Sequence, residues 1–189
     1  MRYSEGGQDV LRSISLNICC GKFVGVIGRS GSGKSSLASV LLRLSMPHTG
    51  HVLIDGVDAG TIGLHAYRRA IGYLPQDSFV FSDATLRQLL DFDGAHSDVE
   101  ILGVLEDVGF DVVIAADSSA NILDQRITTV GITSSGQQQL ICFARLLLQD
   151  PDIYVFDEGE IQVHTSPDVS LCSARCTRIH SSVVVTQMN

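Results

Sequence analysis

The sequence lacks any hydrophobic run of membrane-spanning length. Apolar residues make up 44% of its 189 residues and the mean hydropathy is +0.23. Even so, no stretch approaches the roughly 20 apolar residues that a transmembrane helix needs. The longest apolar runs, 23–27 and 153–156, have the length of buried strands. Short apolar runs bounded by Gly, Asp and Pro are typical of an α/β core around a parallel sheet.

Basic clusters and metal-ligand patterns are also missing. The formal net charge is −8, without a cluster of Lys and Arg, which argues against nucleic-acid binding through a basic face. Five cysteines occur, an odd number without zinc-ligand spacing, so reduced thiols are expected. The first residues do not show the basic-then-apolar pattern of a signal peptide. We therefore expect a cytoplasmic chain that is soluble in isolation.

A Gly/Ser-rich stretch directly follows the apolar run 23–27. Residues 28–35 match the phosphate-loop pattern G-x-x-x-x-G-K-[ST] at every fixed position. The glycines of such a loop let backbone N–H groups converge on phosphate oxygens, and the helix that follows adds its positive end. Lys34 would contact the β- and γ-phosphates, and the Ser35 hydroxyl would ligate Mg²⁺. The predicted nucleotide-binding residues are Gly28, Arg29, Ser30, Gly31, Ser32, Gly33, Lys34, Ser35 and Ser36.

A second candidate site lies where the apolar run 153–156 ends in two carboxylates, Asp157 and Glu158. A buried parallel strand brings its last residue to the edge of the sheet where α/β proteins bind ligands. There Asp157 would hold Mg²⁺, largely through water, and Glu158 would polarise an attacking water. Taken alone, the segment is also compatible with a strand end carrying ordinary solvated acids. The phosphate loop favours the metal site.

Apolar periodicity indicates the remaining elements. The alternation of Ile14, Leu16 and Ile18 with polar residues predicts a half-buried strand. Shorter runs predict strands at 52–54, 71–74 and 183–185, with a turn at Asp55-Gly56.

From about residue 78 to 148 the pattern is helical, and one helix is expected to bury a stripe of Val99, Leu102, Leu105 and Val108. We expect a single domain over 1–189. Its core lobe would take about 1–77 and 149–189, and its helical subdomain about 78–148.

Several segments together resemble the nucleotide-binding domain of ABC transporters. Pro75-Gln76-Asp77 lies where this family has its Q-loop, and Thr133–Gln137 lies where it has the signature L-S-x-G-Q. The resemblance implies an α/β P-loop NTPase with a mixed core sheet and a helical signature subdomain, and it implies ATP and Mg²⁺ as ligands. It further implies that Gln76 contacts Mg²⁺ and the attacking water, and that Tyr3 stacks on adenine. The signature residues implied to contact ATP are Ser134, Gly136 and Gln137.

The pattern is most similar to the second nucleotide-binding domain of the multidrug-resistance-associated C subfamily. This similarity is carried by residues 54–58, 62–65, 74–77 and 79–82, and an intact Glu158 fits a second domain better than a first. The resemblance implies ATP binding and hydrolysis coupled to transmembrane transport. It implies as partners a second nucleotide-binding domain, arranged head to tail, and the transmembrane domains of a transporter. The chain would then lie peripherally on the cytoplasmic side of a membrane.

The chain departs from the family pattern in three places. Thr133 replaces the usual Leu of the signature, and 159–164 does not read as a D-loop ending in Asp. Gln187 or Asn189 takes the place of the switch histidine, and either amide can hydrogen-bond but cannot become positively charged. Relative to the family, we expect a C-terminal truncation.

Two hypotheses on function stay open. The chain is either an ABC-type ATPase whose hydrolysis is weak or absent in isolation, or a non-hydrolytic ATP-binding or dimerisation module. The second hypothesis includes a truncated remnant without a transport role. The intact pair Asp157-Glu158 favours the first, and the three departures favour the second.

Overall fold

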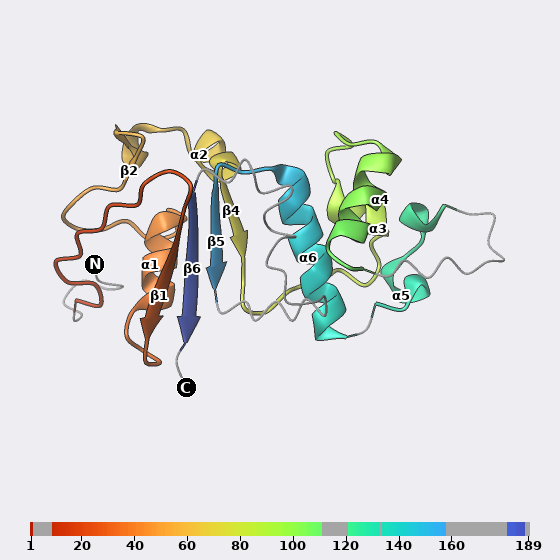
Figure 1. Cartoon of the computed structure of the whole chain (residues 1–189), viewed down its shortest axis with the longest axis horizontal. Coiled ribbons are helices and arrows are strands. Elements are labelled where there is room, and N and C mark those ends of the chain that lie inside the picture. Colours follow the sequence, from red (N-terminus) through yellow and green to blue (C-terminus); the bar gives the residue numbers. More distant parts are fainter. Residues whose placement is uncertain (2–8, 111–120, 133, 158–180, 188–189) are drawn as a thin grey trace. The chain divides into compact units, whose positions relative to one another are not determined.

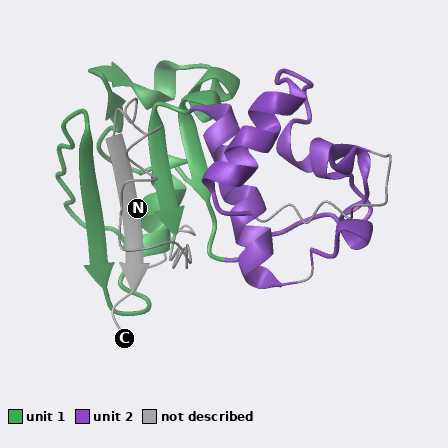
Figure 2. Cartoon of the chain, turned by 45° about the vertical axis from the view of Figure 1, so that its right-hand side comes forward, with its two compact units in different colours: residues 1–76, 151–159, 178–189 green, residues 77–150, 160–177 purple. Residues whose placement is uncertain are grey.

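The structure, a computed structural model, describes residues 1, 9–110, 121–132, 134–157 and 181–187. The chain divides into two compact units (Figure 2). Unit 1 contains 1–76, 151–159 and 178–189, and unit 2 contains 77–150 and 160–177. Within the described ranges, no helix is both long and apolar enough to cross a bilayer.

Unit 1 is built on a four-stranded parallel sheet with the strand order β1-β6-β5-β4. These strands are β1 (Lys22–Gly28), β6 (Ser181–Gln187), β5 (Ile153–Asp157) and β4 (Ile71–Leu74). The runs predicted as strands at 23–27, 71–74, 153–156 and 183–185 all lie within them. All four arrowheads in Figure 1 point to one edge of the sheet. The carboxyl ends of the strands therefore meet there, as expected of a ligand-binding edge.

Antiparallel pairing occurs in a separate two-stranded sheet, in which β2 (Leu53–Ile54) pairs with β3 (Val57–Asp58). The connection is the predicted Asp55-Gly56 turn, whose φ angles of 49° and 80° are both positive. Such angles are required in a type I′ hairpin turn, and they explain why Gly follows Asp here.

The core of unit 1 lies between the sheet and two helices, α1 (Lys34–Leu41) and α2 (Leu64–Ala70). Its buried cluster consists of Ala38, Leu42, Ala59, Tyr67, Ile71 and Val155, and Tyr73 packs against it. The Tyr67 hydroxyl donates a hydrogen bond to the Leu41 carbonyl oxygen, so the polar end of this buried ring is satisfied. The cluster fixes α1 and α2 against the strands that carry the candidate site residues.

The strand predicted at 14–18 is wrong. This segment has no strand assignment, and Ile14 and Leu16 are each 53% exposed. Alternation makes one face of a segment apolar, but a strand also needs a neighbouring backbone to pair with. In the described part of the chain no strand pairs with 14–18. Ser13, directly before it, has a φ of 47°, which is not an extended conformation.

Unit 2 is helical. Its elements are α3 (Leu86–Leu90), α4 (Asp98–Asp107), η2 (Ile122–Asp124), α5 (Ile127–Val130) and α6 (Ser135–Gln149). The longest helix, α6, packs against α3 and α4. Leu86, Ile101 and Ala144 are fully buried, one from each of these three helices.

The stripe predicted for α4 has the wrong phase. Val99 is 80% exposed and Leu102 is exposed as well, whereas the buried residues are Ile101, Val104, Leu105 and Val108. Residues spaced by three drift around a helix by about 60° at each step, so four of them cannot share one face. The buried set follows the i, i+3, i+4, i+7 spacing, which stays on one face.

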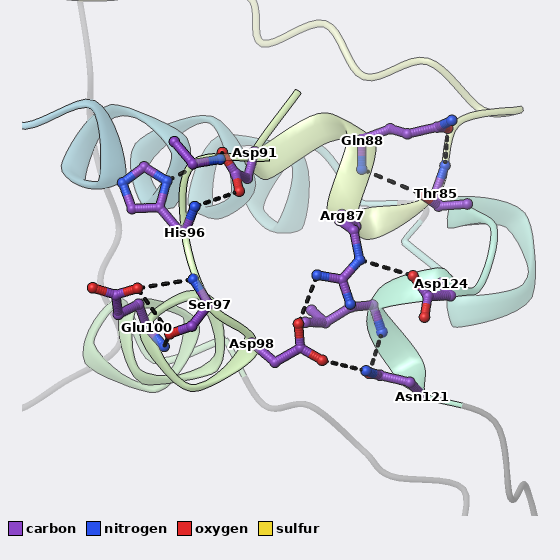
Figure 3. A network of polar contacts seen from close by, with 12 residues as sticks. Thr85, Arg87, Gln88, Asp91, His96, Ser97, Asp98, Glu100, Asn121 and Asp124 are labelled. Atoms are coloured by element: carbon purple, nitrogen blue, oxygen red, sulfur yellow. Dashed lines mark hydrogen bonds and ion pairs between the residues drawn. The ribbon is translucent and has the colours of Figure 1, made fainter. Parts of the chain in front are cut away.

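A polar network joins α3, α4 and η2 in unit 2 (Figure 3). Thr85 and Gln88 form a capping box at the start of α3, and Ser97 and Glu100 form another at the start of α4. Each box satisfies two backbone N–H groups that the helix leaves without an acceptor.

Arg87 on α3 links α4 to η2. Its guanidinium donates to Asp98 Oδ1 at 2.7 Å and to Asp124 Oδ1 at 2.8 Å. The hydrogen bond from Arg87 to Asp98 holds the pKa of Asp98 below its ordinary value, and the Asn121 amide adds a second contribution.

Candidate nucleotide-binding site

The phosphate loop connects β1 to α1. Gly28 is the last residue of β1 and Gly33 is the N-cap of α1. The loop folds back on itself through a hydrogen bond from Ser32 N to the Arg29 carbonyl oxygen, 3.1 Å. The predicted setting, a loop between an apolar strand and a helix, is therefore present.

Two glycines of this loop occupy places that a side chain would obstruct. A Cβ atom at Gly28 would stand 2.6 Å from Ser32 Oγ, closer than real Cβ contacts. Gly33 has a φ of 96°, and a Cβ there would stand 3.1 Å from Leu11 Cδ2. The loop thus needs glycine for the left-handed backbone at Gly33, whereas a Cβ at Gly28 would require the Ser32 hydroxyl to move.

Lys34 is a buried cation at the first position of α1, with 7% of its surface exposed. Its ammonium donates to the carbonyl oxygens of Gly28, at 2.8 Å, and of Arg29, at 3.0 Å. Both acceptors belong to the phosphate loop, so the positive charge lies within the curve of the loop. An ammonium has three N–H donors. Two of them bind these loop carbonyl oxygens, which leaves one for a phosphate oxygen.

The two serines after Lys34 differ in exposure. Ser35 is exposed and Ser36 is buried, both in the first turn of α1. The helix presents its first backbone N–H groups and the positive end of its dipole toward the loop. The N-cap residue Gly33 has no side chain to cap them. This arrangement suits an anion.

Asp157 ends β5 and is buried, with 9% of its surface exposed. The Tyr73 hydroxyl on the neighbouring strand β4 donates to Asp157 Oδ2 at 3.2 Å. Burial raises the pKa of Tyr73 to about 12, and the negative charge of Asp157 and this hydrogen bond act in the same direction. Tyr73 therefore stays protonated and remains a donor to the carboxylate.

Gln76 lies two residues after the end of β4 and is exposed. Because β4 and β5 are parallel neighbours, Gln76 and Asp157 both emerge at the edge where the phosphate loop follows β1 (Figure 1). The structure thus brings the loop, Gln76 and Asp157 to one edge of the sheet in unit 1.

The signature residues begin α6 in unit 2. Ser134 is the N-cap, its Oγ accepts from Gln137 N at 3.1 Å, and Gln137 Oε1 accepts from Ser134 N at 3.2 Å. Ser134 and Gly136 are exposed. This S-x-x-Q capping box was visible in the sequence, although we had predicted only a ligand contact there.

Several predicted residues lie outside the described part of the chain. They are Tyr3, Thr133, Glu158, the D-loop segment 159–164 and Asn189. Gln187 ends strand β6, and its side chain is likewise not described. The sequence does not predict the contact of Tyr73 with Asp157. A Tyr within an apolar run is typical of a core residue, and only the pairing of β4 with β5 shows that its hydroxyl lies near Asp157.

The residues around the loop fit Mg-ATP. The buried Lys34 cation would supply positive charge for the phosphates, and the buried Asp157 carboxylate would supply an oxygen ligand for Mg²⁺.

Comparison with known proteins gives one consistent family. The family model described as ABC transporter matches residues 11–160. ABC transporter C family member 3 of Dictyostelium discoideum is 40% identical over 169 residues, which are 89% of this chain and 12% of that protein. ATP-binding cassette sub-family C member 10 of Mus musculus is 35% identical over 185 residues, 97% of this chain and 12% of that protein. The chain thus spans about an eighth of these curated relatives.

A solved structure gives the same result for the fold. The structure of a bacterial Atm1-family ABC exporter with ATP bound has a TM-score of 0.79 and 27% identity, over 98% of this chain and 32% of that chain. The predicted α/β P-loop NTPase fold and the predicted family are confirmed, whereas the similarity to a second rather than a first nucleotide-binding domain stays a prediction. The chain belongs to the ABC transporter family, as an ATP-binding domain of the C-subfamily type.

Proposed function

We propose that this chain binds Mg-ATP through residues 28–36 and serves as a nucleotide-binding domain of an exporter. The domain would cover 1–189, with a core lobe over about 1–77 and 149–189 and a helical lobe over about 78–148. The observation that carries the proposal is the buried Lys34 ammonium, which is held by two carbonyl oxygens of the loop. A cation held at a glycine-rich loop that leads into a helix N-terminus favours a phosphate chain.

Ser35, Gln76 and Asp157 would hold Mg²⁺, which when bound neutralises charge that builds up on the phosphate oxygens. Glu158 directly follows Asp157 in the sequence. It would accept a proton from the attacking water, with Gln76 as second contact to that water. Tyr3 would stack on the adenine.

A second nucleotide-binding domain would complete the site. Ser134, Gly136 and Gln137 would contact the ATP held by that partner, because each domain of a head-to-tail pair lends its signature to the other. The exposure of Ser134 and Gly136 at the start of α6 supports this, because it leaves both residues accessible to a partner.

Transmembrane domains are the other proposed partner, and the chain would lie on the cytoplasmic face of their membrane. Phe79 and Phe81 follow the Q-loop and stack edge to face, with ring centroids 5.1 Å apart. They are 74% and 64% exposed. A pair of exposed aromatic rings is a common contact in protein interfaces, which supports docking of a transporter helix here.

Hydrolysis by the isolated chain is proposed to be weak or absent. Thr133, the 159–164 segment and the amide in place of the switch histidine all depart from the family pattern. The alternative is a non-hydrolytic ATP-binding or dimerisation module, which the same departures favour and the pair Asp157-Glu158 opposes.

Titration of the purified chain with a fluorescent ATP analogue and Mg²⁺ tests binding. Lys34→Met should weaken affinity roughly 10- to 100-fold, since hydrogen bonds to charged groups contribute about 1.5–3 kcal/mol. Lys22→Met is the matched control, because Lys22 is the other lysine of the chain and is exposed on β1. Equal affinity of both variants would refute the assignment of the loop.

Phosphate release separates the two functions. A weak ATPase should release phosphate slowly, and more slowly still in Glu158→Gln, whereas a non-hydrolytic module should release none above background in either chain. Release at the rate of an ordinary transporter, abolished by Glu158→Gln, would contradict weak hydrolysis and exclude the non-hydrolytic module.

A further inference from the structure

We propose that Tyr73 is a positioning residue that orients the Asp157 carboxylate for Mg²⁺, an inference that rests on the function proposed above. The two residues lie on adjacent parallel strands, where Tyr73 is in register with Val155. Asp157 lies two residues further along β5, on the same side of the strand as Val155. The phenol spans this offset and donates to Oδ2 at 3.2 Å.

Both partners are fixed by their surroundings. The Tyr73 ring packs against the buried cluster that contains Ile71 and Val155, so the hydroxyl has a defined position. Asp157 is 9% exposed, and a buried carboxylate needs hydrogen-bond donors to hold one orientation. A carboxylate offers about four lone-pair sites, so one phenol contact leaves capacity for Mg²⁺ or its water ligands.

The hydrogen bond from Tyr73 to Asp157 also connects Asp157 to the strand that leads to Gln76. Tyr73 lies on β4, and Gln76 follows the same strand by two residues. A displacement of the end of β4 would therefore change the orientation of Asp157 together with the position of Gln76. Through Tyr73, the Q-loop strand acts directly on the metal-binding carboxylate.

A purely structural role for Tyr73 predicts a different result. A core tyrosine with a satisfied hydroxyl would lose some stability on conversion to Phe, with no change in how ATP binding depends on Mg²⁺. A positioning role predicts a loss confined to the Mg²⁺-dependent part of the affinity, because loss of a partner that orients a metal ligand typically lowers metal affinity about 10- to 100-fold.

Tyr73→Phe keeps the ring and removes the hydroxyl. Affinity for N-methylanthraniloyl-ATP is measured by equilibrium titration, once with Mg²⁺ and once with EDTA. We expect affinity in Mg²⁺ to fall about tenfold, and affinity in EDTA to stay within about twofold of the unaltered chain.

Tyr67→Phe is the matched control. Tyr67 belongs to the same core cluster, and its hydroxyl donates to a backbone carbonyl, that of Leu41, rather than to Asp157. It should lower the melting temperature about as much as Tyr73→Phe and leave the Mg²⁺ dependence unchanged. Combining Tyr73→Phe with Asp157→Asn should add no further loss, since the carboxylate is already gone.

The outcomes separate the inference from the proposed function. The inference is overturned if Tyr73→Phe keeps the Mg²⁺ dependence of the unaltered chain, as Tyr67→Phe should, or if it loses affinity equally in Mg²⁺ and in EDTA. It is also overturned if the loss persists in full in the Asp157→Asn background. If the unaltered chain binds no nucleotide, the proposed function fails and the inference with it.

Discussion

Replacing Asp91 by alanine tests how the turn between α3 and α4 is held. The Asp91 side chain is 4% exposed and accepts hydrogen bonds from Ala95 N at 3.0 Å and from His96 N at 2.8 Å (Figure 3). The imidazole Nδ1 of His96 is a third contact, at 3.1 Å. Alanine has no acceptor, so both backbone N–H groups lose their partner.

The expected loss of stability follows from these two amides. An unsatisfied buried donor costs about 1–3 kcal/mol, and partial access of water to these partly buried amides keeps the sum at about 2–4 kcal/mol. For a chain of this size, 1 kcal/mol shifts the melting temperature by about 2–4 °C. We expect Asp91→Ala to melt roughly 5–15 °C lower by far-UV circular dichroism.

Asp93→Ala is the control, because Asp93 is an exposed aspartate two residues away. Hydrogen exchange at Ala95 and His96 would locate the loss in the turn rather than elsewhere in the chain. A difference of about 2 °C between Asp91→Ala and Asp93→Ala would correspond to only about 1 kcal/mol or less. In that case the turn does not depend on the Asp91 carboxylate, and the reasoning is refuted.

Two further predictions concern the pH dependence of stability and the glycines of the phosphate loop. Burial raises the pKa of Asp91, but the hydrogen bonds from His96 and Ala95 outweigh it and hold that pKa below its ordinary value. The stability that Asp91 contributes is therefore present above a pH of about 4, the unfolded pKa, and is lost as the pH falls through the lower folded pKa. In melts from pH 6 to 3 the gap between the unaltered chain and Asp91→Asn should narrow; a constant gap contradicts this. Gly33→Ala should weaken binding of the ATP analogue about tenfold, because its φ of 96° costs a residue with a side chain about 1–2 kcal/mol. Its Cβ would also stand 3.3 Å from the Val10 carbonyl oxygen, whereas nothing lies within 4 Å of a Cβ at Gly25. Equal affinity of Gly33→Ala and Gly25→Ala would show that the loop adapts.

Features that depend on a few neighbouring residues were predictable from the sequence. The phosphate loop, the Asp55-Gly56 turn and the strand ending at Asp157 each rest on local chemistry: glycine at positive φ, an Asp-Gly pair in a hairpin, and an apolar run with a polar end. The structure has these elements where they were expected. The roles assigned to the individual site residues remain predictions.

Features that depend on distant partners were not predictable. Ile14 and Leu16 alternate like a strand, but pairing requires a second backbone that the local sequence cannot reveal. The contact from Tyr73 to Asp157 joins residues far apart in the chain, and only the order of β4 and β5 brings them together. The buried face of α4, by contrast, could have been predicted, because Ile101, Val104, Leu105 and Val108 follow the i, i+3, i+4, i+7 spacing in the sequence itself.

The capping box at the start of α6 has a consequence for how variants of the signature are interpreted. Ser134 and Gln137 satisfy each other's backbone N–H groups, so the two side chains begin a 15-residue helix even before any partner arrives. Removing an N-cap side chain costs about 0.5–2 kcal/mol. A mutational scan through these positions would therefore not distinguish a variant that fails to assemble with a partner from one in which α6 is frayed. A low yield of folded protein would be misread as a loss of the proposed transport function. Ser134→Thr keeps a hydroxyl that can cap the helix and changes the side-chain shape at the start of α6, so it separates loss of the cap from loss of the nucleotide contact proposed above.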